Sequence, residues 1–177
     1  MSVFGGAGND LIDATSSAER ARIYGGGGDD TLNFDSNSGG NEEAAALYGG
    51  YGDDTFAVDL TLKVGYYPQG EPTLSGGDGQ DLFDLTVGLG NVDLEFPETD
   101  DTSRTVIEIS DFQPGIDRLQ LAADGAEISL SEAPDGTYTD VILTYPATAS
   151  DPSVQGIIHL AGVTGLTLAD IVLPAAA

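Results

Sequence analysis

The sequence predicts an all-β protein, in which a solenoid of short parallel strands precedes an antiparallel β lobe. Four glycine-rich nonapeptides recur in the first half of the chain without gaps. Short alternating apolar runs, bounded by turn residues, fill the second half. No stretch has the apolar spacing of a long amphipathic helix. We place the solenoid at residues 1–90 and the lobe at residues 91–177.

The four nonapeptides share the pattern G-G-x-G-x-D-x-U-x, in which U is a large apolar residue. They are GGAGNDLID from Gly5, GGGGDDTLN from Gly25, GGYGDDTFA from Gly49 and GGDGQDLFD from Gly76. The U residues are Ile12, Leu32, Phe56 and Phe83, and the apolar residues two places before each nonapeptide are Val3, Ile23, Leu47 and Leu74. Each glycine turn should therefore join two short strands that point large side chains inward.

The spacing of the nonapeptides indicates how the coils stack. They begin 20, 24 and 27 residues apart, whereas a coil of two nine-residue halves needs about 18 residues. All four glycine turns should thus lie along one edge, with insertions along an irregular opposite edge. Segment 63–73 should protrude as a loop, because it contains Pro68, Gly70 and Pro72.

The second half is predicted to begin with a polar, loop-rich stretch at 91–104. Residues 105–112 alternate as a strand, and PGIDRLQL continues as a turn and another strand. A β-hairpin is expected around Pro134-Asp135-Gly136. GIIHLAG adds a strand, and LTLADIVL is expected to hold a short helix or strand.

The composition excludes several kinds of binding partner and of functional site. Thirty Asp and Glu stand against five Lys and Arg, for a net charge of −25, so nucleic acid and anionic membranes are disfavoured partners and cations are favoured. The absence of Cys excludes disulfides, and a single His excludes two-His zinc motifs. No apolar run approaches the roughly 20 residues that cross a bilayer, and the N-terminus lacks the features of a secretory signal peptide.

Calcium is the cation that the repeats suit. It takes 6–8 oxygen ligands at about 2.3–2.6 Å, and glycine turns expose carbonyl oxygens with no Cβ in the way. The sixth position of each nonapeptide supplies a carboxylate, at Asp10, Asp30, Asp54 and Asp81. Two stacked turns, about 4.8 Å apart, can hold an ion between them. A role for these Asp residues in turn capping alone does not explain their recurrence.

These nonapeptides resemble those of the repeats-in-toxin (RTX), or hemolysin-type, calcium-binding proteins. The resemblance implies a β-roll in which positions one, three and five of one loop and two, four and six of the next share an ion, giving about three ions. The first site would comprise Gly5, Ala7, Asn9, Gly26, Gly28 and Asp30; the second Gly25, Gly27, Asp29, Gly50, Gly52 and Asp54; the third Gly49, Tyr51, Asp53, Gly77, Gly79 and Asp81. The first should be weakest, because Asn9 is neutral, and Asp10 would lie in a half-occupied site at an open end.

Segments 106–121 and 157–173 resemble the C-terminal region of serralysin-type proteases and other type I secreted proteins. The resemblance implies that the chain is an export and folding domain, secreted by a Gram-negative bacterium through the type I machinery. It would fold outside the cell, where calcium is abundant, and serve an upstream catalytic or adhesive domain. The chain departs from the family in having glycine turns on one edge only. Met1-Ser2 runs almost directly into the first repeat, so we expect either a fragment of a larger secreted protein or a small protein.

Two other functions remain open. A carbohydrate- or surface-binding module, similar to the repeat modules of alginate epimerases, would bind polysaccharide, and Tyr24, Tyr48 and Tyr51 could form an outer aromatic ladder for it. A small enzyme is not expected, since no G-x-S-x-G motif is present. We interpret the remaining candidates as a partly exposed strand histidine, His159, and as a solvated acidic loop, Glu95, Glu98, Asp100 and Asp101.

Overall fold

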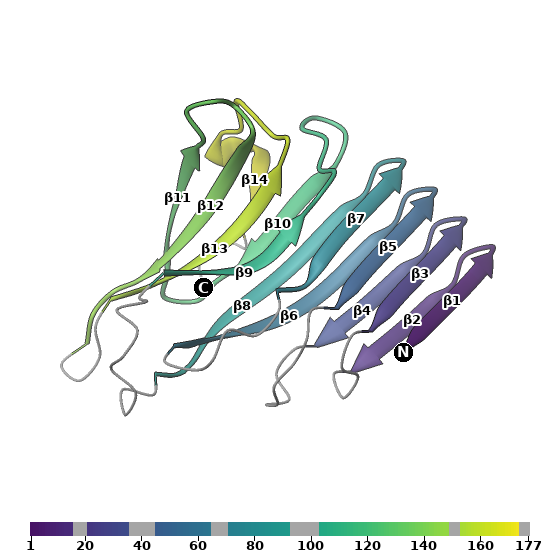
Figure 1. The fold of residues 1–177 in the computed structure, drawn as a ribbon, viewed down its shortest axis with the longest axis horizontal. Helices are drawn as coiled ribbons and strands as arrows, with labels where there is room; N and C mark the ends of the chain where they lie inside the picture. Colours follow the sequence, from purple (N-terminus) through teal and green to yellow (C-terminus); the bar gives the residue numbers. More distant parts are fainter. Residues whose placement is uncertain (16–20, 36–44, 65–70, 93–102, 149–152, 174–177) are drawn as a thin grey trace.

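The fold is a two-sheet solenoid, seen in a computed structural model of the chain. The structure describes residues 1–15, 21–35, 45–64, 71–92, 103–148 and 153–173. From residue 2 to residue 122 the chain alternates between the sheets, so that strands neighbouring in sequence lie on opposite faces of one coil (Figure 1). The predicted all-β class, a parallel solenoid followed by antiparallel strands, is confirmed.

The first sheet has eight strands. In sheet order they are β1 (Ser2–Ala7), β3 (Arg22–Gly27), β5 (Ala46–Tyr51), β7 (Thr73–Asp78), β9 (Ser103–Ile109), β13 (Val154–Ala161), β12 (Tyr138–Tyr145) and β11 (Glu127–Glu132). Pairing is parallel from β1 to β13 and antiparallel from β13 to β11. The predicted hairpin around Asp135 therefore joins β11 to β12.

The second sheet has six strands, all parallel. They are β2 (Leu11–Thr15), β4 (Thr31–Asp35), β6 (Thr55–Val64), β8 (Leu82–Val92), β10 (Arg118–Ala122) and β14 (Ile171–Val172). A 3₁₀ turn at Leu168–Asp170 precedes β14, so the terminal segment holds both a short helix and a short strand. No helix of the described residues is long and apolar enough to cross a membrane.

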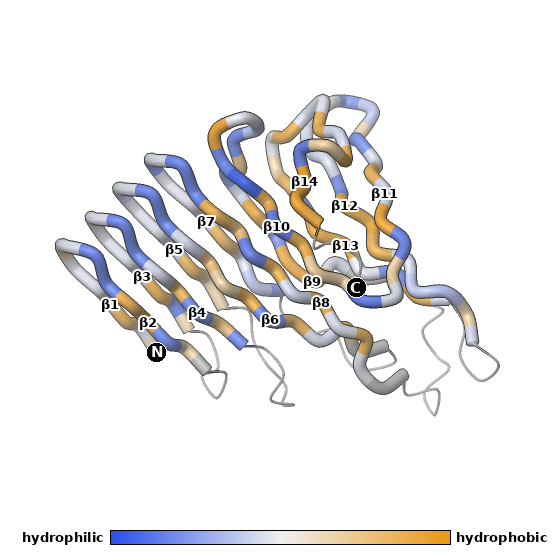
Figure 2. The backbone as a smooth tube through the Cα atoms, turned by 180° about the vertical axis from the view of Figure 1, so that it is seen from behind, coloured by the Kyte–Doolittle hydropathy of each residue, from blue (hydrophilic) through white to orange (hydrophobic). Residues whose placement is uncertain are grey.

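The core lies between the two sheets. Side chains alternate along each strand, and the predicted inward residues of the second to fourth coils, such as Leu32, Phe56 and Phe83, are fully buried. The Phe56 and Phe83 rings stack with centroids 5.0 Å apart. Val3 and Ile12 are only partly buried because the first coil has no preceding neighbour. Figure 2 shows the apolar stretches along the strands and hydrophilic residues at the turns.

The predicted C-terminal lobe shares both sheets with the solenoid. β9 continues the first sheet beside β7, and β10 continues the second beside β8. The Tyr145 hydroxyl also donates to the Val87 carbonyl at 2.8 Å, which ties the lobe to β8. Sequence patterning missed this continuity because it depends on pairing between strands some thirty-six residues apart, as in Leu82 with Arg118.

Two predicted loops are only partly described. The protruding segment 63–73 overlaps β6 and β7 at its ends, and residues 65–70 lie outside the described part. The segment 91–104 is shorter as a connection than predicted, because β8 extends to Val92 and β9 begins at Ser103. Residues 93–102, which include the four candidate acids, are likewise outside the described residues.

Candidate metal centre

The four glycine turns stack in register along one edge of the solenoid, as predicted (Figure 1). Their second positions pair directly, Gly6 with Gly26, Gly26 with Gly50 and Gly50 with Gly77. The glycines at the second and fourth positions of every turn have positive φ, between 100° and 141°. A Cβ on Gly50 would collide with the Gly26 carbonyl group, so glycine is required both for the backbone conformation and for the approach of the next loop.

The glycine conformation determines which gap each carbonyl oxygen faces. Gly8 stands at the fourth position of its loop. Its carbonyl oxygen would lie 2.7 Å from a Cβ on Gly28, so this oxygen faces the following loop. The second-position oxygens face the same way. By contrast, the carbonyl oxygen of Gly25, at the first position, would lie 2.6 Å from a Cβ on Gly5. The carbonyl oxygen of Gly27, at the third position, accepts the Gly8 N–H at 2.6 Å. First- and third-position carbonyls therefore face the preceding loop.

This orientation differs from the carbonyl assignment made from the sequence, which directed positions one and three, such as Gly5 and Ala7, toward the following loop. The physical reason is the positive φ at positions two and four, which turns the peptide planes between them. Each gap still receives carbonyl oxygens from both of its loops. Which of these oxygens bind a metal stays a prediction.

Side chains at positions five and six cross the gaps in opposite directions. At position five, Asn9 Oδ1 accepts the Asp29 N–H at 3.0 Å, and Asp29 Oδ1 accepts the Asp53 N–H at the same distance. At position six, Asp30 Oδ1 accepts the Asp10 N–H at 2.8 Å, and Asp54 Oδ1 accepts that of Asp30 at 2.8 Å. Each gap thus contains a fifth-position side chain from one loop and a sixth-position side chain from the next.

The second carboxylate oxygen of every sixth-position Asp is buried without a hydrogen-bond partner among the described residues. These atoms are Oδ2 of Asp10, Asp30, Asp54 and Asp81. The last three side chains belong to residues that are only 1% exposed. Burying an ionised carboxylate oxygen without a partner is costly, so such an atom in a native fold requires a water or an ion as its partner.

The unpaired oxygens lie in small spaces next to the first glycine of each loop. A Cβ on Gly5 would lie 2.8 Å from Asp10 Oδ2 and 2.6 Å from the Gly25 carbonyl oxygen of the next loop. A Cβ on Gly49 would likewise meet Asp54 Oδ2 and, at 2.6 Å, the Gly76 carbonyl oxygen. A carboxylate oxygen and a carbonyl oxygen therefore converge where a side chain would otherwise be. All of these atoms are hard oxygen donors, which fits calcium.

Electrostatics favour a cation in the same place. Burial raises the pKa of Asp54 to about 6, and the neighbouring carboxylates of Asp81, Asp30 and Asp29 add to the rise. Burial also raises the pKa of Asp81 to about 6, with contributions from Asp117, Asp111 and Asp53. A divalent ion beside these groups would favour their charged forms.

Side chains alone do not make a metal site. No three His, Cys, Asp or Glu side chains of the described residues form a metal-binding cluster. The ion would therefore depend on the backbone carbonyls of the glycine turns for most of its ligands. Two acids near the fourth loop, Asp111 and Asp117, were not among the metal ligands predicted from the sequence. The signal was present, because Asp117-Arg118-Leu119 repeats the D-x-U spacing of the nonapeptides.

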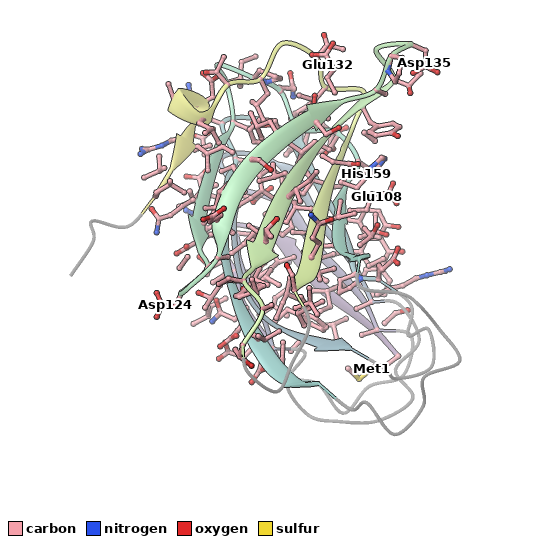
Figure 3. All side chains as sticks on the ribbon, turned by 90° about the vertical axis from the view of Figure 1, so that its left-hand side faces the viewer. Met1, Glu108, Asp124, Glu132, Asp135 and His159 are labelled. Carbon is pink, nitrogen blue, oxygen red and sulfur yellow. The ribbon has the colours of Figure 1, made fainter. Side chains whose placement is uncertain are left out.

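The other candidate residues lie away from the glycine turns or on their outer side. Phe4, Tyr24 and Tyr48 stack with centroids 4.9 Å apart, and Tyr51 is exposed on a glycine turn and is not part of this stack. His159 lies on β13 with its Nδ1 2.8 Å from Asp140 Oδ1, and its side chain is 29% exposed. Glu108 of β9 pairs with His159 in the sheet, and Figure 3 shows the two residues close to each other. The prediction of a partly exposed strand histidine is confirmed.

The solved structures that are similar to this chain include one repeat subunit. It is the solution structure of the AlgE6R3 subunit from the Azotobacter vinelandii mannuronan C5-epimerase, 23% identical over 98% of this chain and 84% of that chain, with a TM-score of 0.39. No family model matches the chain, and no curated protein matches it. The similarity carries no assignment of function.

Proposed function

We propose that this chain is a calcium-binding β-roll module whose stacked glycine loops hold Ca²⁺ ions. The observation that carries the proposal is the row of buried, unpaired oxygens on the sixth-position Asp residues, each beside a carbonyl oxygen. The same atom is unpaired at the sixth position of all four repeats, so the unpaired oxygen is a property of the repeat itself. The surrounding donors are all oxygens.

Three gaps between glycine loops supply the principal sites. We assign to them the side-chain pairs predicted from the sequence, which are Asn9 with Asp30, Asp29 with Asp54, and Asp53 with Asp81. Carbonyls of the second and fourth positions of one loop and the first and third of the next complete the donor set. Three ions would change the formal charge from −25 to −19.

Calcium would then act as part of the fold. Each ion cancels repulsion between carboxylates of adjacent coils and connects both coils through their backbone. Because the unfolded chain lacks these stacked loops, binding free energy becomes folding free energy. One site occupied at a hundred times its dissociation constant contributes about 2.7 kcal/mol. Several such sites can decide whether a chain of this charge folds.

The test is a calcium titration of chelator-treated protein followed by far-UV circular dichroism, with magnesium as the control ion. We expect a cooperative gain of β signal and thermal stability at micromolar to millimolar calcium, and little effect of magnesium, which prefers to keep its water ligands. A chelated protein that is fully folded and indifferent to calcium would overturn the proposal. Asp59→Asn serves as a matched variant, since Asp59 is an exposed residue of β6 outside the loops.

We further propose that the module is exported by a type I route and folds outside the cell. Support comes from the likeness of segments 106–121 and 157–173 to type I secretion tails. Low cytosolic calcium would keep the acidic chain open for transport, and extracellular calcium would fold it. Removing residues 157–173 should abolish export from a host carrying the type I machinery; unchanged export would contradict this role.

A surface- or polysaccharide-binding function is a second candidate because of the exposed aromatic stack. Phe4 is 70% exposed, but the faces of Tyr24 and Tyr48 are partly covered by the stacking itself. Phe4, at one end of the stack, is therefore the ring of the stack most accessible to a sugar. Glycan binding at saturating calcium that is lost in Phe4→Ala would support this function, and its absence would leave the stack a packing feature.

A further inference from the structure

A fifth loop of different sequence closes the row of glycine turns. Residues 111–117, DFQPGID, connect β9 to β10 next to the fourth glycine turn. The Arg118 N–H donates to the Asp81 carbonyl at 2.8 Å, as the Leu82 N–H donates to the Asp54 carbonyl one coil earlier. Leu119 then pairs with Phe83 in the second sheet. The segment thus occupies the position of a next turn without the glycine pattern.

Asp117 corresponds to the sixth-position Asp of the glycine turns, in a loop that is one residue longer than they are. Its Oδ1 accepts the Asp81 N–H at 3.1 Å, just as Asp81 Oδ1 accepts the Asp54 N–H at 2.9 Å. It is 7% exposed. It differs from the other sixth-position residues in that its Oδ2 accepts the Gln113 N–H at 2.8 Å. Both oxygens of Asp117 therefore have donors, and this carboxylate is held in place.

Asp111 brings a further carboxylate to the same gap. It accepts hydrogen bonds from the Gly76 N–H at 2.9 Å, the Gly77 N–H at 3.1 Å and the Ser75 hydroxyl at 2.7 Å. The side chain therefore reaches back from the fifth loop onto the first two glycines of the fourth. No glycine turn earlier in the row carries an acid that bonds in this way among the described residues.

The oxygen that lacks a partner here is Asp81 Oδ2. Asp81 is 1% exposed, and a Cβ on Gly76 would collide with this oxygen. Gly76 is also the residue whose N–H binds Asp111. Hydrogen bonds from backbone and hydroxyl donors account for the oxygens of Asp111 and Asp117, but Asp81 Oδ2 is left buried and unpaired.

We propose that the gap between the fourth glycine turn and residues 111–117 is a fourth Ca²⁺ site, with Asp81 Oδ2 and Asp111 as carboxylate ligands and Asp117 as a nearby fixed charge. The Asp81 carboxylate would then be shared between the third site, which its Oδ1 faces, and this one. The proposal rests on the proposed function and extends it to a loop without the glycine motif. Gly77 and Gly79 repeat the positive φ of their counterparts, so their carbonyls face this gap. The ion would bind the last glycine turn to the connection that leads into the C-terminal strands.

Counting bound calcium on the full chain by native mass spectrometry and titration calorimetry tests the site. We expect four ions on the wild type, from the three glycine gaps and this one. Asp111→Asn should bind three, with the β signal retained, because an amide oxygen can still accept the Gly76 N–H. Asp124→Asn, an exposed acid of the lobe, is the control and should bind four. A wild type that binds three, unchanged by Asp111→Asn, would overturn this site and leave the proposed function intact.

A second variant adds charge without removing any hydrogen bond. Gln80 is the exposed fifth-position residue of the fourth turn, where the two preceding turns carry Asp29 and Asp53. Gln80→Asp should tighten one calcium-binding step by on the order of tenfold and leave the others unchanged. An unaltered set of affinities would overturn the fourth site, even if Asp111→Asn fails to fold. A wild type that binds no calcium would reject the proposed function as well.

Discussion

Asp54→Asn should stabilise the calcium-free protein and destabilise the calcium-bound one. Burial raises the pKa of Asp54 from 3.8 to about 6, and a rise of roughly two units corresponds to about 3 kcal/mol of cost for the ionised form at neutral pH. Asparagine removes that cost and keeps an oxygen to accept the Asp30 N–H. Its amide would also stand beside the Gly76 carbonyl, which can accept a hydrogen bond from it.

With calcium the sign reverses, because the variant has lost a charged ligand shared by two coils. We expect the calcium midpoint to rise at least about tenfold. In chelator, the thermal midpoint should rise by about 2–4 °C for each kcal/mol gained. Thermal and urea unfolding with and without calcium measure both effects, with Asp59→Asn as the unaffected control. A variant that is destabilised equally in both conditions would refute the reasoning, since Asp54 would then be a structural cap only.

Three further outcomes follow from the same geometry. In chelator, stability should increase as the pH falls from about 7 through about 6, because Asp54 and Asp81 bind protons more tightly when folded, and calcium should abolish this gain; pH-dependent urea unfolding measures it. Asn9→Asp should strengthen the weakest calcium step in calorimetry, whereas a uniform change of all steps would contradict separate sites. Gly50→Ala should cost at least about 3 kcal/mol or prevent folding, since its Cβ would meet the Gly26 carbonyl, while Gly125→Ala, with positive φ but open space, should cost about 1 kcal/mol; equal losses would refute the stacking argument.

Much of the solenoid could be predicted because its signals are local and repeated. The inward positions of Leu47, Phe56 and Phe83 follow from a fixed offset to each glycine turn. The stacking of the turns follows from their spacing of 20, 24 and 27 residues, which is one full coil plus insertions. The hairpin at Asp135 follows from its turn residues.

The rest depended on information that a single stretch of sequence does not contain. The carbonyl directions depend on the sign of φ at glycines such as Gly26, which can adopt either sign. The fifth loop was missed because Asp111 stands where the pattern expects glycine, although the apolar Ile109 and the D-x-U spacing at Asp117 were in place. Only the pairing of β10 with β8 reveals that this segment continues the row.

Anomalous diffraction from crystals grown with calcium tests the central claim most directly. We predict calcium density between neighbouring loops of the row, within ligand distance, about 2.3–2.6 Å, of the oxygens of Asp30, Asp54 and Asp81 that lack partners here. Density at these positions would establish that the repeats hold ions as part of the fold. Turns without density at millimolar calcium, with water or a rotated carboxylate satisfying those oxygens, would contradict it.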